Sequence, residues 1–211
     1  MFGVARRRPG GWLRLPMRLD IPPGEFAGYI FDCDGTLVDT MPLHYRAWCL
    51  ALRAAGLPHD VDEDLFYTMG GVPTRRVAVL LVAHYRLPAD AGQVFHDKER
   101  NFLALQTELR VVEPVVAFAR RAARTHPVSV ATGSPRPILD RTLKLAGLAE
   151  IFTVRVTPED VVHGKPAPDM FLLAAERMRV APRDCLVFED AAPGFAAAAA
   201  AGMRCVRVPS R

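Results

Sequence analysis

Two aspartates two residues apart, Asp32 and Asp34, are the first side chains along the chain whose spacing suggests chemistry. They follow the apolar run Tyr29 to Phe31, which is typical of a short buried strand. Gly35 then allows a sharp turn, because it lacks a Cβ. In an extended segment both carboxylates point to the same side, where they repel each other unless a cation is nearby. The pattern indicates a polar turn or a cation site. An EF-hand loop is excluded, because it needs glycine at its sixth position and Gly35 is fourth.

Polar side chains also follow the later apolar runs that are predicted to be strands. Strands alternate with helices after residue 113, which favours a parallel sheet covered on both faces. Ligands bind beyond the carboxyl ends of the strands in such sheets. The polar residues expected there, besides the two aspartates, are Thr132, Gly133, Ser134, Lys165, Glu189 and Asp190. The sequence therefore predicts a single site that combines hydroxyl groups, a lysine and several carboxylates.

These residue types suit the transfer of a phosphoryl group. A carboxylate such as Asp32 can attack phosphorus to form an aspartyl phosphate. Asp34 can protonate the leaving oxygen and then activate water against the intermediate. Lys165, the Thr132 hydroxyl and the backbone N–H groups around residues 133–134 would meet the negative charge of the transition state. Other interpretations are a surface position for Lys165 and a helix N-cap for Thr132.

The carboxylates also suit a magnesium ion. Mg²⁺ takes oxygen ligands from one or two carboxylates together with the substrate phosphate. We expect Asp32, Asp190 and the backbone carbonyl of Asp34 to bind it, with Glu189 acting through a water molecule. The alternative for Glu189 is a surface acid at a strand end, and Asp39 is expected to cap the turn rather than bind metal.

Apolar periodicity predicts the elements that position these residues. Strands are expected at 29–31, 128–131, 151–156, 185–188 and 205–208, and helices from 113 and at about 137–146, 169–179 and 195–201. Between residues 41 and 109 only helical spacing occurs, including a third apolar stripe that runs from Phe95 to Leu109. The chain therefore reads as an α/β sheet core with an all-helical unit inserted after the first strand.

Composition excludes several classes of protein. The chain has 211 residues, of which 50% are apolar and 24% charged, and it contains no apolar run long enough to span a membrane. The net charge is +4, but five arginines lie in the first 18 residues, so the remainder gives no signal for nucleic acid. Residues 1–26 are expected to be an Arg-rich disordered tail. The four cysteines form no C-x-x-C pair, which argues against zinc and for reduced thiols in the cytoplasm.

Four short motifs resemble, in order and spacing, those of the haloacid dehalogenase-like hydrolases: D-x-D-G-T-L, T-G-S, H-G-K-P-A-P-D and V-F-E-D-A-x-x-G. The resemblance covers residues 28 to 208, approximately. It implies a Rossmann-like parallel sheet of strand order 3-2-1-4-5, with a core at 27–40 and 112–211 and a helical cap of subclass I at 41–111. It also implies the roles that follow: nucleophile for Asp32, acid/base for Asp34, phosphate binding for Thr132 and Lys165, and metal binding for Glu189 and Asp190.

The β-phosphoglucomutase-like branch of this family is the most similar, and it points to residues of the cap. His44 lies on an apolar face, where a structural role is the default, but its distance from Asp32 matches the cap histidine of this branch. Lys98 either extends to solvent from its helix or matches the cap lysine. The loop Gly-x-Pro-Thr-x-Arg resembles that of fructose-1-phosphate phosphatases, which makes Arg76 the matched substrate-binding arginine.

These observations predict a Mg²⁺-dependent phosphatase that forms an aspartyl phosphate and acts on a small phosphorylated metabolite, with a sugar phosphate such as fructose 1-phosphate as the expected substrate. A sugar phosphate mutase of the β-phosphoglucomutase kind is the alternative, and a catalytically silent binding protein is a third reading. The expected partner is the phosphorylated small molecule, without nucleic acid or membrane. The protein is expected to be a cytoplasmic monomer.

Overall fold

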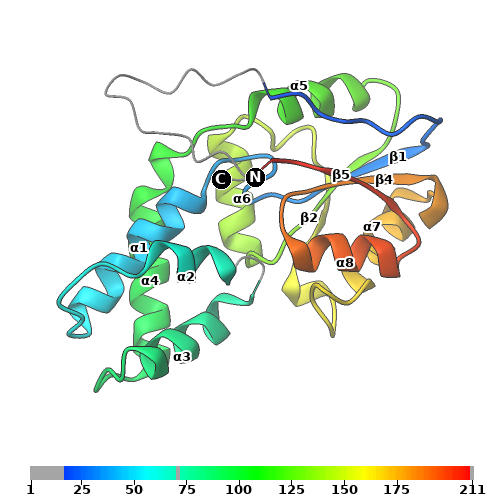
Figure 1. Ribbon diagram of the computed structural model, residues 1–211. Helices are drawn as coiled ribbons and strands as arrows, with labels where there is room; N and C mark the ends of the chain where they lie inside the picture. The colour runs from blue at the N-terminus through cyan, green and yellow to red at the C-terminus, as the bar shows by residue number, and fades with distance from the viewer. Residues whose placement is uncertain (1–16, 70–71, 210–211) are drawn as a thin grey trace, which may run out of the picture.

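A five-stranded parallel sheet forms one half of the molecule. The computed structural model describes residues 17–69 and 72–209. Within them the strands are β1 (Gly28–Phe31), β2 (Val128–Ala131), β3 (Val154–Val156), β4 (Cys185–Glu189) and β5 (Arg204–Arg207). Their order is β3-β2-β1-β4-β5, and all neighbouring pairs are parallel (Figure 1). The predicted fold class and strand order are confirmed.

Helices cover both faces of the sheet, because successive side chains of each buried strand point to opposite faces. Phe31, Val130 and Phe188 share one apolar cluster with α5 (Glu113–Ala122) and α6 (Arg136–Leu145). Ile30 and Val187 share the other cluster with α7 (Asp169–Met178) and α8 (Ala192–Ala200). The central strands are therefore fixed from both sides, and their carboxyl ends are held at one edge of the sheet.

Some element boundaries differ from those predicted. The strand expected from Ile151 begins at Val154, because Ile151 and Phe152 donate backbone hydrogen bonds to Leu148 and complete a turn. The helix expected from residue 195 begins at Ala192, since proline is well tolerated in the first helical turn. The third stripe of the helical unit ends as an α-helix at Leu105, four residues before its expected end.

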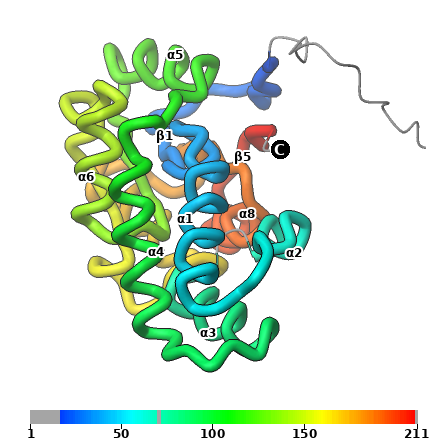
Figure 2. Tube along the Cα trace, turned by 90° about the vertical axis from the view of Figure 1, so that its left-hand side faces the viewer, coloured from blue at the N-terminus to red at the C-terminus, as the bar shows by residue number. Residues whose placement is uncertain are grey.

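The helical unit has its own buried core. It contains α1 (Met41–Ala54), α2 (Glu63–Thr68), α3 (Thr74–His84) and α4 (Ala91–Leu105), followed by the short 3₁₀ helix η1 (Gln106–Glu108). Trp48, Leu52, Phe66 and Leu81 are buried together inside it. Figure 2 shows α1 and α4 side by side.

The two segments that join the helical unit to the sheet lie next to each other. The Asp39 N–H donates to the Arg110 carbonyl at 2.7 Å, and the Val112 N–H donates to the Leu37 carbonyl at 2.9 Å. The chain thus leaves the core for the helical unit and returns from it at one place, directly beside the end of β1.

Residues 17–26 pack on the sheet core. Met17 and Leu19 contact the apolar cluster, and Phe26 is buried. The Arg204 guanidinium lies 4.2 Å from the centroid of the Phe26 ring and donates to the Pro23 carbonyl at 2.6 Å. This part of the expected disordered tail is therefore placed against β5, whereas residues 1–16 lie outside the described part of the chain.

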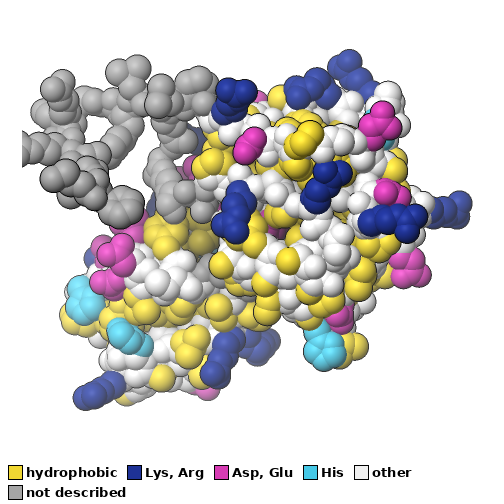
Figure 3. Space-filling model, turned by 45° about the vertical axis from the view of Figure 1, so that its right-hand side comes forward, with side chains coloured by type: hydrophobic (Ala, Val, Ile, Leu, Met, Phe, Trp, Pro, Cys, Tyr) yellow, Lys and Arg dark blue, Asp and Glu magenta, His cyan; other side chains and the backbone are white. Residues whose placement is uncertain are grey.

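The surface carries charges of both signs. Figure 3 shows Lys and Arg side chains scattered among acidic ones over one face of the molecule. In the described ranges, no helix is both long enough and apolar enough to cross a membrane. The four cysteines are free thiols, as expected.

Candidate active site

A cavity of about 280 Å³ lies between the carboxyl ends of the strands and the helical unit. The sheet core contributes to its wall the predicted polar residues Asp32, Asp34, Thr132, Gly133, Ser134, Lys165, Glu189 and Asp190. The helical unit contributes His44, Lys98 and Thr74, with apolar side chains that include Met41, Trp48 and Phe66. Residues from distant parts of the sequence therefore meet at the edge of the sheet where the pattern predicts a ligand.

Asp32 and Lys165 form a buried ion pair at the centre of this edge. The Asp32 N–H donates to the Phe188 carbonyl at 2.9 Å, which extends the pairing of β1 with β4 and fixes the aspartate at the strand end. Lys165 Nζ donates to Asp32 Oδ1 at 2.7 Å and to Glu189 Oε2 at 2.9 Å. Burial opposes the charge on Lys165, but the two carboxylates outweigh it and raise the pKa of this lysine.

Carboxylates outnumber cations around this pair. One oxygen each from Asp32, Glu189 and Asp190 lies within 4.8 Å of the others. Burial and the charge of Glu189 raise the pKa of Asp32, and burial together with Asp32 raises the pKa of Asp190 to about 7. Three carboxylates with one ammonium leave an excess of negative charge that a divalent cation would neutralise. The oxygen donors fit Mg²⁺.

Two glycines make room for these carboxylates. A Cβ on Gly194 would lie 2.0 Å from Glu189 Cδ, and a Cβ on Gly35 would lie 2.2 Å from Asp190 Oδ2. Gly35 also has a φ of +90°, which other residues rarely adopt. Glu189 is only 2% exposed, so it is not a surface acid. The sequence analysis gave no role to Gly194, although it closes the fourth motif.

Asp34 has a different environment from Asp32. Its Oδ1 accepts from Thr40 Oγ1 and its Oδ2 from Ser134 Oγ, both at 2.6 Å, and His44 Nε2 is 3.5 Å from Oδ1. Burial opposes ionisation of Asp34, but His44 and the hydroxyl groups of Ser134 and Thr40 outweigh it and lower its pKa. Asp34 is therefore held as an anion that can accept a proton. Its side chain lies outside the cluster of three carboxylates.

The loop after β2 supplies the hydroxyl groups. The Thr132 N–H donates to the Val156 carbonyl at 3.1 Å, so the loop begins in register with β3. Thr132 Oγ1 accepts from the Ser134 N–H at 3.1 Å. The N-cap of α6 is Pro135, and the N-cap interpretation of Thr132 is therefore wrong. Thr132 instead orients the loop that brings Ser134 to Asp34.

The cap residues divide into two groups. His44 stacks on Phe102, with ring centroids 3.9 Å apart, and reaches Asp34. Lys98 is 1% exposed and donates to Glu99 at 2.8 Å, so it does not extend to solvent. Arg76, by contrast, is exposed on α3 and does not line the cavity. Residues 70–71 of the predicted cap loop lie outside the described ranges, whereas residues 72–74 line the cavity.

Comparison with known proteins identifies the family. Residues 26–202 match the family model "haloacid dehalogenase-like hydrolase". The chain belongs to the haloacid dehalogenase-like hydrolases. The predicted resemblance is confirmed, and so is the prediction of an enzyme, a phosphoric monoester hydrolase of this family.

Several haloacid dehalogenase-like relatives match over most of their length. Fructose-1-phosphate phosphatase YqaB of Escherichia coli is 37% identical over 87% of this chain and 97% of its own. A phosphorylated carbohydrates phosphatase of Thermotoga maritima is 34% identical over 82% and 81%. The crystal structure of CbbY from Rhodobacter sphaeroides in complex with phosphate superimposes with a TM-score of 0.76 at 27% identity, covering 88% and 87%.

Proposed function

We propose that this hydrolase is a Mg²⁺-dependent phosphatase of a small sugar phosphate such as fructose 1-phosphate, with an aspartyl phosphate at Asp32 as intermediate. The observation that carries the proposal is the cluster of Asp32, Lys165, Glu189 and Asp190 at the floor of a cavity that the helical cap covers. The name of the Escherichia coli relative supports the choice of substrate.

In the first step, an Asp32 carboxylate oxygen attacks phosphorus as the bond between phosphorus and the sugar oxygen breaks. The leaving sugar oxygen takes a proton from Asp34. Asp34 is an anion before substrate binds; the negative charge of the incoming phosphate raises its pKa, and Asp34 takes up from solvent the proton that it then gives to the leaving oxygen. In the second step Asp34 takes a proton from water, the water oxygen bonds to phosphorus, and the bond to Asp32 breaks.

The side chains around Asp32 have complementary roles. Lys165, Thr132 and the backbone N–H groups of the loop after β2 offer donors for the phosphoryl oxygens as charge spreads over them. Asp32, Asp190 and the Asp34 carbonyl would hold Mg²⁺, with Glu189 acting through water. When bound, the ion neutralises charge on the phosphate and keeps Asp32 ionised. The cap keeps bulk water from the reaction.

A mutase of the β-phosphoglucomutase kind is less well supported. Its bisphosphate intermediate requires a second cationic region on the cap side. Among the described residues that line the cavity, the lysines are Lys165, bound to Asp32 and Glu189, and Lys98, bound to Glu99. Arg76 is exposed instead. This arrangement favours water as the acceptor and free phosphate as the product.

The test is phosphate release from a panel of sugar phosphates with Mg²⁺ or with EDTA. We expect fructose 1-phosphate to be hydrolysed, EDTA to abolish the reaction and Mg²⁺ to restore it. Asp190→Asn should raise the Mg²⁺ concentration needed for half-maximal rate, whereas Asp64→Asn on the exposed face of α2 should not. Conversion of β-glucose 1-phosphate plus a trace of glucose 1,6-bisphosphate into glucose 6-phosphate, with little phosphate released, would favour the mutase.

A further inference from the structure

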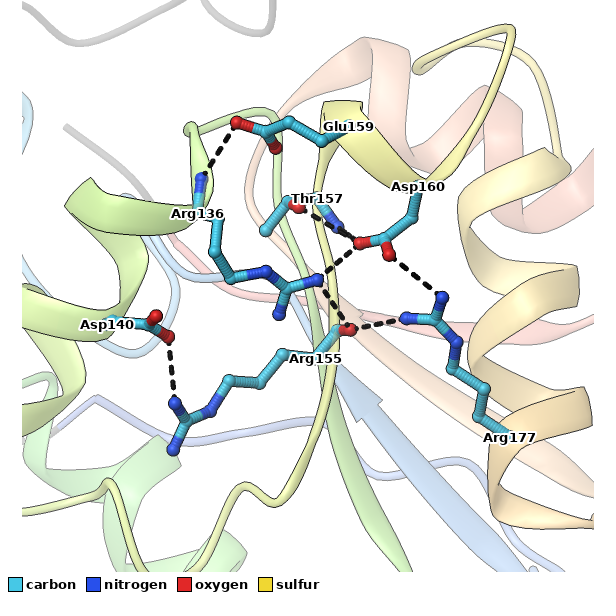
Figure 4. Close-up of polar contacts among 7 residues, drawn as sticks. All are labelled: Arg136, Asp140, Arg155, Thr157, Glu159, Asp160 and Arg177. Carbon is cyan, nitrogen blue, oxygen red and sulfur yellow. Dashed lines mark hydrogen bonds and ion pairs between the residues drawn. The ribbon is translucent and has the colours of Figure 1, made fainter.

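A cluster of arginines and acids lies at the carboxyl end of β3 (Figure 4). Asp160, the last residue of the 3₁₀ helix η2 (Pro158–Asp160), is at its centre. Its Oδ2 accepts from the Thr157 N–H at 2.9 Å, from Thr157 Oγ1 at 3.0 Å and from the Arg136 guanidinium. Its Oδ1 accepts from the Arg177 guanidinium at 2.8 Å. Four donors thus converge on one carboxylate.

Arg136 connects this carboxylate to the loop after β2. It is the first residue of α6 and follows Ser134 by two positions. Its backbone N–H donates to Glu159 Oε1 at 3.1 Å, while its guanidinium donates to Asp160 and to the Arg155 carbonyl. Glu159 therefore holds the main chain of Arg136, and Asp160 holds its side chain. Arg136 directly follows the hydroxyl loop, which is the loop of residues 132–135 after β2.

Both loops joined in this way line the cavity, but the joining side chains do not. Thr132, Gly133 and Ser134 come from the loop after β2, and Pro158, Gly164 and Lys165 come from the segment after β3. Asp160, Arg136 and Arg177 are absent from the cavity wall. The cluster therefore joins two segments outside the cavity, and the same two segments carry into the cavity the hydroxyl groups and the lysine.

We propose that Asp160 is a positioning residue for the phosphatase reaction, holding the Lys165 segment and the hydroxyl loop in a fixed relation through Arg136. This assignment rests on the proposed function. Hydrogen bonds between a guanidinium and a carboxylate are strong and directional, and the Asp160 carboxylate, which is 17% exposed, is partly shielded from water. A small displacement of groups aimed at the transition state lowers the rate more than it weakens substrate binding.

The first test compares Asp160→Asn with Asp140→Asn. The control removes the carboxylate that pairs with Arg155 in the same cluster, at 2.8 Å and with 44% of its side chain exposed, and it leaves Arg136 in place. We expect Asp160→Asn to lower kcat by about 10- to 100-fold with KM nearly unchanged. The kcat and KM of Asp140→Asn should stay close to those of the wild type. Equal losses in both variants, or a near-normal kcat in Asp160→Asn, would overturn the assignment.

The second test uses Arg136→Gln alone and combined with Asp160→Asn, each confirmed as folded by circular dichroism. Because both residues act through one contact, the double variant should lose little more activity than either single variant. If the losses of kcat in the two single variants multiply in the double variant, the two residues do not act through one contact, and the assignment is overturned. Rates on p-nitrophenyl phosphate keep the two proposals separate. An enzyme that hydrolyses this ester but no sugar phosphate would refute the proposed substrate class. The ratios of kcat between the variants, measured on the same ester, would still decide the role of Asp160.

Discussion

At the scale of single residues, Asp32 and Asp34 differ because of what reaches them from other elements. Lys165 and two further carboxylates surround Asp32, whereas Asp34 receives two hydroxyl groups and a histidine. Burial and the charge of Glu189 raise the pKa of Asp32 although Lys165 opposes them, whereas His44 and the two hydroxyl groups outweigh burial and lower the pKa of Asp34. A bound Mg²⁺ would offset the negative charge around Asp32 and favour its ionised form, and the phosphate of a bound substrate would favour the protonated form of Asp34.

Gly194→Ala tests the crowded contact at Glu189. The added Cβ would need the space of Glu189 Cδ, which is 2.0 Å away. Alanine favours a helix by about 1 kcal/mol over glycine, so the substitution does not weaken the helix itself. A weaker affinity for Mg²⁺ would therefore come from the displaced Glu189 carboxylate. We expect the Mg²⁺ concentration for half-maximal rate to rise by about 10-fold or more. Ala199→Ser, on the exposed face of the same helix, is the control. An unchanged Mg²⁺ requirement would show that Glu189 does not support the metal.

At the scale of elements, one rule accounts for most of the site: in a parallel sheet, ligands bind beyond the carboxyl ends of the strands. It brings Lys165 to Asp32 across 133 positions of sequence, and it needs only the order of strands and helices. The rule does not say which hydroxyl groups turn toward Asp34. It also cannot give the rotation of α3, where Val77 and Leu81 face inward and Arg76 is exposed.

The Asp160 cluster had no counterpart in the sequence analysis. Arginine and acid side chains on four separate elements leave no periodic pattern, and their pairing depends on how α6 and α7 pack beside β3. Residue types alone therefore predict polar groups that line the cavity, whereas the groups that join its supporting elements become visible only in the folded chain.

The same cluster predicts a pH dependence of stability. Burial opposes ionisation of Asp160, but Arg177, Thr157 and Arg136 outweigh it and lower its pKa from 3.8 to about 2. A lowered carboxylate pKa stabilises the fold above the unfolded value, and this contribution is lost as the pH falls toward the folded value. Asp160→Asn should therefore reduce the free energy of unfolding by about 2 kcal/mol at pH 7 and by progressively less below pH 4.

Urea unfolding at several pH values measures this difference between wild type and Asp160→Asn. Asp140→Asn, whose carboxylate is more exposed, should show a smaller difference at pH 7. A difference for Asp160→Asn that stays constant between pH 7 and pH 3 would contradict the prediction.

At the scale of the whole molecule, the cap and the sheet core meet over one cavity and are joined at one place. The adjacent crossing segments fix both ends of the cap, and the buried Gln106 near its second end donates to Thr142 of α6 at 2.6 Å. His44 then reaches Asp34 from the cap. The polar residues of the core and the residues of the cap therefore enclose the cavity together.

The segment of residues 17–26 should contribute to stability and not to catalysis, because it packs on the core away from the cavity. Met17 and Leu19 are partly buried, whereas Arg18 and Asp20 are exposed. Met17→Ser with Leu19→Ser should lower the free energy of unfolding by about 1–2 kcal/mol and leave kcat unchanged. The alternating pair Arg18→Ser with Asp20→Ser is the matched control. Equal melting temperatures for the two double variants would show that this contact adds no stability.

The mechanism proposed for this site requires Asp32 to carry the phosphoryl group. The most direct measurement is acid quenching of the Asp34→Asn enzyme during reaction with Mg²⁺ and p-nitrophenyl phosphate, whose leaving group needs no proton. Peptide mapping by mass spectrometry then locates the phosphate. Without Asp34 to activate water, we expect a phosphorylated peptide modified at Asp32, and none when Asp32→Asn is added. Release of p-nitrophenol with no labelled peptide, or with phosphate on another residue, would contradict the account.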